Sequence, residues 1–156
     1  MRPRPVTGGR VRRRCGRAWV LLVLAGMLAC GDPDRAIEAR LTESERAIFM
    51  RGRSVAVPCW TCHDLAGTVD KVGPSLAGVF GRRSGTAPDQ QGSEAMLAAA
   101  IVWDERTLAA FLMDPSGFVP GNRMVSPGVG DPEMLRDLLF YLRHVSQPGA
   151  RDAEPD

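Results

Sequence analysis

The sequence predicts a small all-α domain in which short helices are joined by long loops. Apolar residues recur at three- and four-residue steps over residues 134–145, which is the spacing of one helix face. Residues 70–92 and 116–130 are rich in glycine and proline and are expected to form loops. No stretch alternates apolar and polar residues as a half-buried strand does. A chain of 156 residues, 44% of them apolar, suits one packed domain and excludes two large ones.

The first 29 residues have the pattern of a secretory signal peptide. They contain seven arginines and no acidic residue, and an apolar run over residues 18–29 follows the last arginine. This run is too short to span a bilayer core, which needs about 20 residues. Met27 fits an ordinary cleavage site poorly, whereas Leu28-Ala29-Cys30-Gly31 resembles a bacterial lipoprotein box. The resemblance implies that Cys30 becomes a lipidated N-terminus; the alternative is an uncleaved or differently cleaved signal with a free Cys30 thiol.

The sequence therefore divides into a lipoprotein-type signal peptide (1–29), a polar tether (30–41), a helical domain (42–147) and a disordered tail (148–156). The whole chain has a net charge of +2, but without the seven N-terminal arginines 13 basic and 18 acidic side chains remain, a net of −5. We expect a periplasmic protein that is held at the membrane by a lipid on Cys30, with no nucleic-acid partner.

The domain is expected to begin with a helix near residue 42. Thr42 and Ser44 are candidate N-caps, because the acidic residues that follow them favour a first helical turn. Gly52 is expected to end this helix. An alanine-rich segment over residues 94–101 is expected to form a second, short helix.

Two further helices have clear start signals. Asp104 is an N-cap for a helix that runs through Leu112, and Asp114-Pro115 ends it, because a residue before proline disfavours helical geometry. Asp131-Pro132 starts the last helix, since a capping residue is followed by proline at the first helical position. The apolar face of this helix continues to Val145.

Residues 59–63 read Cys-Trp-Thr-Cys-His, a C-x-x-C-H motif that is the attachment signature of c-type haem. On a helix, positions i, i+3 and i+4 share a face. Cys59 and Cys62 can therefore bond the two haem vinyl groups, and His63 can reach the iron as its proximal ligand. One covalent haem c would also anchor a small domain whose long loops do not stabilise themselves.

Two other uses of a C-x-x-C motif fit this sequence less well. A thioredoxin-like redox pair occurs in a strand–helix context, which the sequence lacks. A zinc site needs further Cys or His ligands nearby. The only other histidine, His144, is expected as a solvated imidazole in the last turn of the final helix.

The second axial position of the iron is expected to be filled by Met124. This residue lies in a loop with proline and glycine on both sides, which can present one side chain without burying it in a helix face. The loop lies far enough beyond His63 to reach the opposite side of a haem. Met96 has no defined orientation. Three more methionines are interpreted as packing residues because they lie in expected helices: Met50, Met113 and Met134.

Taken together, these motifs mean that the chain resembles class I cytochromes c of the mitochondrial and bacterial c2-like type over residues 44–146. The resemblance rests on the C-x-x-C-H motif, on residues 72–82, on Trp103 and on the loop 120–124. It implies a small cytochrome c fold in which helices and long loops wrap around one covalently bound haem and its iron.

The resemblance also implies roles for residues around the haem. The Pro74 carbonyl would accept a hydrogen bond from His63 Nδ1–H and fix the imidazole ring. Leu76 would pack on the haem face. Arg82 and Trp103 would approach a haem propionate and supply a charge and an N–H donor.

Three residues would lie where the first and last helices cross: Phe49, Gly52 and Tyr141. Three features depart from the family. Gly92 matches the tyrosine that often reaches a propionate, so Ser93 or water would take its place. Phe111 matches a position that often holds a tyrosine bonded to the methionine sulfur, so that donor is missing. Lys71 is the only lysine in the chain, so the lysine ring usual around the haem edge is missing too.

The leading functional hypothesis is a membrane-anchored, periplasmic monohaem cytochrome c with His/Met ligation. It would carry single electrons between a donor and an acceptor protein and would not itself be an enzyme. One alternative is an electron-transfer subunit of a larger periplasmic dehydrogenase or oxidase complex. A less favoured alternative is a haem-based gas sensor or small peroxidase, which needs an open sixth position on the iron.

Overall fold

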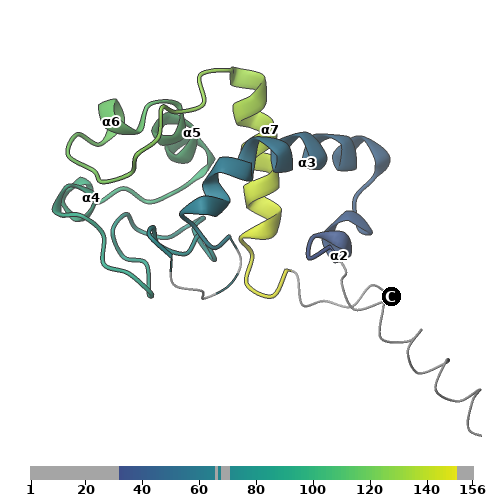
Figure 1. Cartoon of the computed structure of the whole chain (residues 1–156), viewed down its shortest axis with the longest axis horizontal. Coiled ribbons are helices and arrows are strands. Elements are labelled where there is room, and N and C mark those ends of the chain that lie inside the picture. The colour runs from purple at the N-terminus through teal and green to yellow at the C-terminus, as the bar shows by residue number, and fades with distance from the viewer. Residues whose placement is uncertain (1–31, 66, 68–70, 151–156) are drawn as a thin grey trace, which may run out of the picture. The chain divides into compact units, whose positions relative to one another are not determined.

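The computed structural model describes residues 32–65, 67 and 71–150, and the signal segment with Cys30 lies outside them. The described part is helical and contains no β-strand, which confirms the predicted all-α class (Figure 1). Its elements, in chain order, are α2 (Arg35–Glu38), α3 (Glu43–Ala56), the 3-10 helix η2 (Val57–Thr61), α4 (Glu94–Ala99), α5 (Glu105–Met113), α6 (Pro115–Phe118) and α7 (Pro132–Val145).

Helices α3, α5 and α7 begin where the sequence predicts. Thr42 Oγ1 accepts a hydrogen bond from the Glu45 amide, and the Glu45 carboxylate accepts one from the Thr42 amide in return. Asp104 caps α5 in the same reciprocal way with Thr107, and these bonds lower the pKa of the Asp104 carboxyl. Asp131 accepts from two amides at the start of α7.

Helix α3 differs from the expectation at its C-terminal end, because it continues past Gly52 to Ala56. Gly52 is buried where α3 crosses α7, and a Cβ there would overlap the carbonyl oxygen of Asp137 and lie 2.8 Å from Tyr141 Cβ. Glycine therefore serves close helix packing here, as the family resemblance implied, and does not end the helix. Phe49 is fully buried beside it, with its ring centroid 4.9 Å from that of Tyr141.

The core consists of two apolar clusters that share α7. The first cluster lies between α3 and α7 and includes Phe49, Leu138 and Tyr141. The second lies between α5, α7 and the loops, and includes Trp103 and Phe111. Figure 1 shows α7 in the middle of the domain, with α4, α5 and α6 on one side and α2 on the other. Within the described part of the chain, no helix is long and apolar enough to cross a membrane.

The segment expected to be a polar tether is partly folded. Helix α2 lies within it, and Asp34, Ala36 and Ile37 are buried, with Asp34 only 1% exposed. The Tyr141 hydroxyl donates to Asp34 Oδ2 at 2.8 Å, and Ile37 belongs to the first apolar cluster. The segment is polar in composition, but its few buried residues contact α7 and the first apolar cluster, and these contacts stabilise a folded conformation.

We expect Gly52→Ala to destabilise the protein by about 2 kcal/mol. Replacing a helical glycine by alanine gains about 0.5–1 kcal/mol in conformational entropy, but overpacking a closed core costs about 1–3 kcal/mol. Here the obstacle is the backbone of α7, which cannot rotate away as a side chain would.

Denaturant unfolding measures this effect, with Gly130→Ala as the control because a Cβ at Gly130 meets no atom within 4 Å. Equal midpoints for the two variants would show that α3 and α7 do not cross as closely as the structure has them.

Candidate functional site

The Cys59–His63 segment forms a tight turn directly after α3. The amides of Cys62 and His63 both donate to the Cys59 carbonyl oxygen, at 3.1 and 2.9 Å. The turn is a 3-10 helix that ends at Thr61, with Cys62 as its C-cap. Side chains three residues apart in a 3-10 turn are close to eclipsed, so this spacing suits two thiols that bond the same group. Both thiols are free and half-buried, and burial raises the pKa of Cys59.

The His63 ring is held in one orientation by the loop that follows. Its Nδ1 lies 2.7 Å from the Pro74 carbonyl oxygen. Because a carbonyl only accepts, Nδ1 carries the proton and the Nε2 lone pair is left for a ligand bond. Gly73 makes room for the ring, since a Cβ there would lie 2.5 Å from His63 Cε1. Leu76, two residues after Pro74, packs against both apolar clusters.

Lys71 joins the same loop to the cysteine turn, a role that the sequence analysis missed. Its Nζ donates to the carbonyl oxygens of Trp60 at 2.6 Å and His63 at 3.2 Å. The Gly73 amide also donates to the Cys62 carbonyl oxygen at 2.8 Å. These bonds satisfy carbonyls that the short turn leaves unpaired. The only signal in the sequence was a single lysine eight residues after His63, which by itself indicates no partner.

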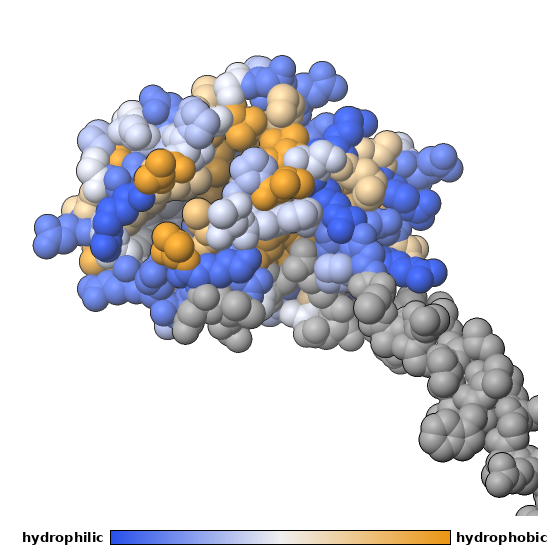
Figure 2. Space-filling model, viewed as in Figure 1, coloured by the Kyte–Doolittle hydropathy of each residue, from blue (hydrophilic) through white to orange (hydrophobic). Residues whose placement is uncertain are grey.

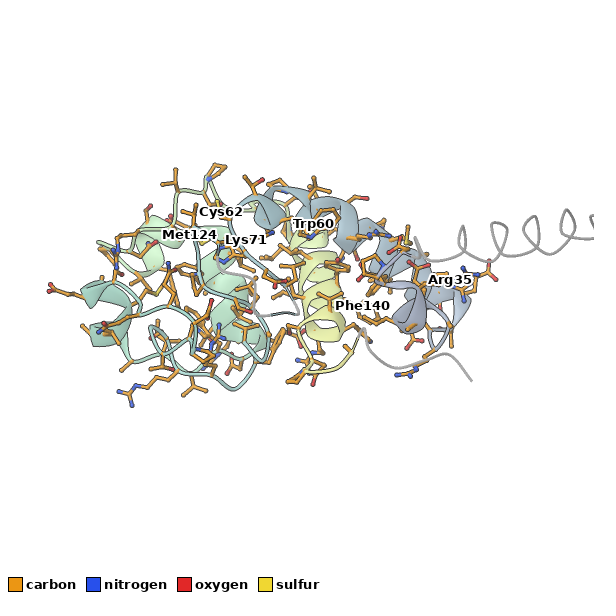
Figure 3. All side chains as sticks on the ribbon, turned by 60° about the horizontal axis from the view of Figure 1, so that its bottom comes forward. Arg35, Trp60, Cys62, Lys71, Met124 and Phe140 are labelled. Carbon is orange, nitrogen blue, oxygen red and sulfur yellow. The ribbon has the colours of Figure 1, made fainter. Side chains whose placement is uncertain are left out.

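Met124 is presented by a loop that is organised by Asn122. The Asn122 side chain donates to the carbonyl oxygens of Pro115 at 2.7 Å and Val119 at 2.8 Å, and its Oδ1 accepts from the Met124 amide at 2.8 Å. Met124 is half-buried against the second apolar cluster, whereas Val125 is fully exposed. In the view of Figure 3, Met124, Cys62 and Lys71 are labelled at the end of the domain opposite to Arg35. Asn122 was also missed from the sequence.

The other methionines differ in how far their side chains are exposed to solvent. The prediction of packing roles is wrong for three of them, which are 42–48% exposed: Met50, Met113 and Met134. Their helices turn other residues to the core, and the flexible thioether remains on the outer face. Met96 is half-buried against the same cluster as Met124. Met96 is therefore the other candidate for the second axial position of the iron.

Arg82 and Trp103 lie on adjoining segments of the loop region. The Trp103 amide donates to the Arg82 carbonyl oxygen at 2.9 Å, and the Trp103 ring is buried with its centroid 5.2 Å from that of Phe111. The half-buried Arg82 guanidinium donates to the carbonyl oxygens of Ala77 and Ser75, and burial lowers the pKa of Arg82. The Asp89 carboxylate acts against this shift, but the guanidinium itself is bonded to carbonyl oxygens, and a partly desolvated cation of this kind suits a further anionic group nearby.

His144 differs from its expected environment. It is half-buried, its Nδ1–H donates to the Phe140 carbonyl oxygen at 2.8 Å, and its ring centroid lies 4.4 Å from that of Phe140. Among the residues that the structure describes, no three His, Cys, Asp or Glu side chains gather as a protein metal site requires.

The cavity and the donor groups fit a covalent haem. Figure 2 shows a hollow bordered by apolar residues between the α4–α5 side of the domain and α3. A haem with vinyls, iron and propionates suits two thiols three residues apart, an imidazole with an available Nε2, a half-buried thioether and a half-buried guanidinium. These groups come from Cys59, Cys62, His63, Met124 and Arg82.

Comparisons with known proteins agree with this site. A family model described as cytochrome c matches residues 49–146. The chain is 40% identical to cytochrome c2 iso-2 of Magnetospirillum fulvum over 87 residues, which is 56% of this chain and 91% of the relative. It is 43% identical to cytochrome c of Chlamydomonas reinhardtii over 106 residues, 67% of this chain and 95% of the relative. The solved structure of cytochrome cH from Methylobacterium extorquens matches with a TM-score of 0.57 at 36% identity, covering 60% of this chain and 95% of that one.

We expect Asn122→Ala to loosen the Met124 loop. The substitution removes three hydrogen bonds, including the acceptor of the Met124 amide. One such bond contributes about 1 kcal/mol, so local opening should make this amide exchange roughly fivefold faster or more. Hydrogen exchange measured by NMR on the purified protein tests this.

Asn122→Asp is the matched variant, because it keeps an acceptor for the Met124 amide and loses both donors to the carbonyls of Pro115 and Val119. Its exchange rate should fall between those of the native protein and Asn122→Ala. Unchanged exchange in Asn122→Ala would show that the loop is held by other contacts.

Proposed function

The chain belongs to the cytochrome c family, and from this premise we propose that it is a membrane-anchored, periplasmic monohaem carrier with His63 and Met124 as axial ligands. Members of this family bind haem c covalently through a C-x-x-C-H motif and transfer electrons to redox partners, and Cys59 and Cys62 are in position for that attachment. Its activity is electron transfer between proteins.

The observation that carries the ligation proposal is the hydrogen bond from His63 Nδ1–H to the Pro74 carbonyl oxygen. The bound haem supplies a one-electron couple between ferric and ferrous iron. The Pro74 carbonyl increases the basicity of the imidazole and keeps Nε2 aimed in one direction. The Gly73 amide donates to the Cys62 carbonyl oxygen and Lys71 Nζ donates to the His63 carbonyl oxygen, so the loop and the turn are tied together beside this bond and the ring needs no rearrangement when the charge of the site changes.

Met124 is favoured as the second axial ligand because its loop is ordered and its side chain is half-buried. Asn122 ties the loop backbone at three points, so that the thioether is presented without support from a helix. A thioether ligand stabilises ferrous iron and raises the reduction potential. Phe111 lies buried in the same cluster and offers no hydrogen bond to the sulfur. The sulfur lone pairs are then more available to iron than in relatives with a tyrosine there.

Arg82 is proposed to face a haem propionate, with Trp103 beside it. Its guanidinium makes hydrogen bonds to two backbone carbonyls and keeps further N–H donors available. A propionate would neutralise a charge that is otherwise half-buried at a cost. Leu76, which touches both apolar clusters, is proposed to cover part of the haem face.

The proposed location rests on the N-terminal sequence. An arginine-rich segment, a short apolar run and the lipoprotein-like box ending at Cys30 precede the domain. Covalent attachment of c-type haem takes place on the exported side of the membrane, which agrees with such a signal. We propose that a lipid on Cys30 holds the mature protein at the periplasmic face of a bacterial membrane.

We expect Met124→Ala to keep the haem attached, lower its reduction potential and open the ferrous iron to carbon monoxide. The variant removes the thioether while both cysteines and His63 remain. Redox titration and the optical spectrum with and without carbon monoxide measure the change.

Met96→Ala is the control, because Met96 is half-buried in the same cluster. If Met96→Ala opens the iron and Met124→Ala does not, the ligand is Met96. Carbon monoxide binding by the native ferrous protein would favour the sensor or peroxidase alternative instead.

We expect Cys59→Ser combined with Cys62→Ser to abolish covalent haem, because no thiol is left for the vinyl groups. Haem staining after denaturing electrophoresis measures this, and Thr61→Ala serves as a control that leaves both thiols in the motif. A stained band that survives the double substitution would contradict the attachment site.

A further inference from the structure

The N-terminal segment of the domain is fastened to the core by buried polar contacts. Asp34 is 1% exposed, accepts a hydrogen bond from the Tyr141 hydroxyl at 2.8 Å and lies 3.5 Å from Arg53 Nε. Arg53 Nη1 also lies 3.8 Å from Glu38 in α2. Because Asp34 is buried between a donor and a cation, freeing the segment would leave Arg53 without its buried partner and Tyr141 without its acceptor.

Apolar and backbone contacts fasten the same segment further along. Ala36 and Ile37 are buried, and Ile37 belongs to the cluster formed by α3 and α7. Arg46 in α3 donates from Nη2 to the Glu38 carbonyl oxygen at 3.2 Å. The chain is therefore fixed to the domain from Asp34 onward, well before the Thr42 cap of α3.

This attachment limits how far the domain can move from a lipid at Cys30. The four peptide units between Cys30 and Asp34 span at most about 14 Å, whereas a free tether up to Thr42 would span at most about 42 Å. On the proposed lipidation of Cys30, we infer that the α2 face of the domain rests against the lipid surface. We define the α2 face as the exposed residues Pro33, Arg35, Ala39 and Arg40.

The charges of the α2 face agree with a bilayer as its partner. Arg35 and Arg40 are exposed on it, and basic residues beside a membrane are attracted to anionic lipid headgroups. The acidic Glu38 in the same helix is half-buried and lies near Arg53, so it is partly neutralised. Figure 3 shows Arg35 at the end of the domain away from Cys62 and Met124.

The attached segment also borders part of the haem motif. A cavity of about 180 Å³ is lined by Pro33 and Asp34 together with Trp60, His63 and Lys71. The His63 side of the site therefore adjoins the segment that leads to the lipid. A domain held this closely reaches redox proteins that are embedded in or bound to the same membrane.

The orientation can be measured on the full-length, haem-loaded protein in vesicles of phosphatidylethanolamine and phosphatidylglycerol. A spin label is placed at Ala39→Cys on the α2 face or at Ser116→Cys in α6, which Figure 1 shows on the opposite side of α7 from α2. Nickel chelated to lipid headgroups should relax the label at residue 39 several-fold more than the label at residue 116. Equal relaxation of the two labels would overturn the inference.

Asp34→Ala combined with Ile37→Ser should free α2 and reduce the difference between the two labels. Glu43→Gln is the control, because Glu43 is exposed at the start of α3 and should leave the difference unchanged. Mass spectrometry of the mature N-terminus separates the two proposals. A lipid on Cys30 with equal relaxation overturns the orientation alone, and an unlipidated N-terminus overturns both the anchor and the orientation.

Discussion

The close crossing of α3 and α7 at Gly52 is the contact on which the rest of the domain depends. Because Gly52 has no side chain, the two helices approach so closely that a Cβ on residue 52 would overlap the Asp137 carbonyl oxygen. Helix α3 then leads directly into the turn that carries Cys59 and Cys62, so the crossing fixes where the thiols lie. Helix α7 carries Tyr141, which holds Asp34, and joins both apolar clusters.

Three polar side chains fix the positions of the loops by bonding their backbone carbonyls. Lys71 and Asn122 each bond two backbone carbonyls, and Arg82 does the same through its guanidinium. Loops of this length have little regular backbone hydrogen bonding, so their carbonyls need other donors when they are removed from water. The three side chains supply these donors next to the groups proposed to hold the haem, and in this way they order the site without a strand.

The sequence predicted the features that depend on neighbouring residues. The caps at Asp104 and Asp131 and the C-x-x-C-H motif are local patterns with a local physical cause, and the helices start where they indicate. The local pattern around Gly52 indicated a helix end, because its partner, the α7 backbone, lies 85 residues further along the chain, and only the family resemblance placed Gly52 at the helix crossing. Asp34 was expected in a tether for the same reason, and the donors Lys71 and Asn122 were missed because their acceptors are ordinary carbonyls that no sequence pattern marks.

The charge of the domain has a consequence for how it would meet a partner. Without the N-terminal arginines the chain has a net charge of −5, and its one lysine is bonded to two carbonyl oxygens. Several arginines are paired with acids, including Arg51 with Asp137 and Arg143 with Glu105. A ring of free lysines, which steers a soluble carrier to an acidic partner, is therefore missing. Under the proposed anchoring, confinement to one membrane raises the effective concentration of the partner. The rate at which the domain meets its redox partner would then depend less on attraction between their charges and more on both proteins being held at the same membrane.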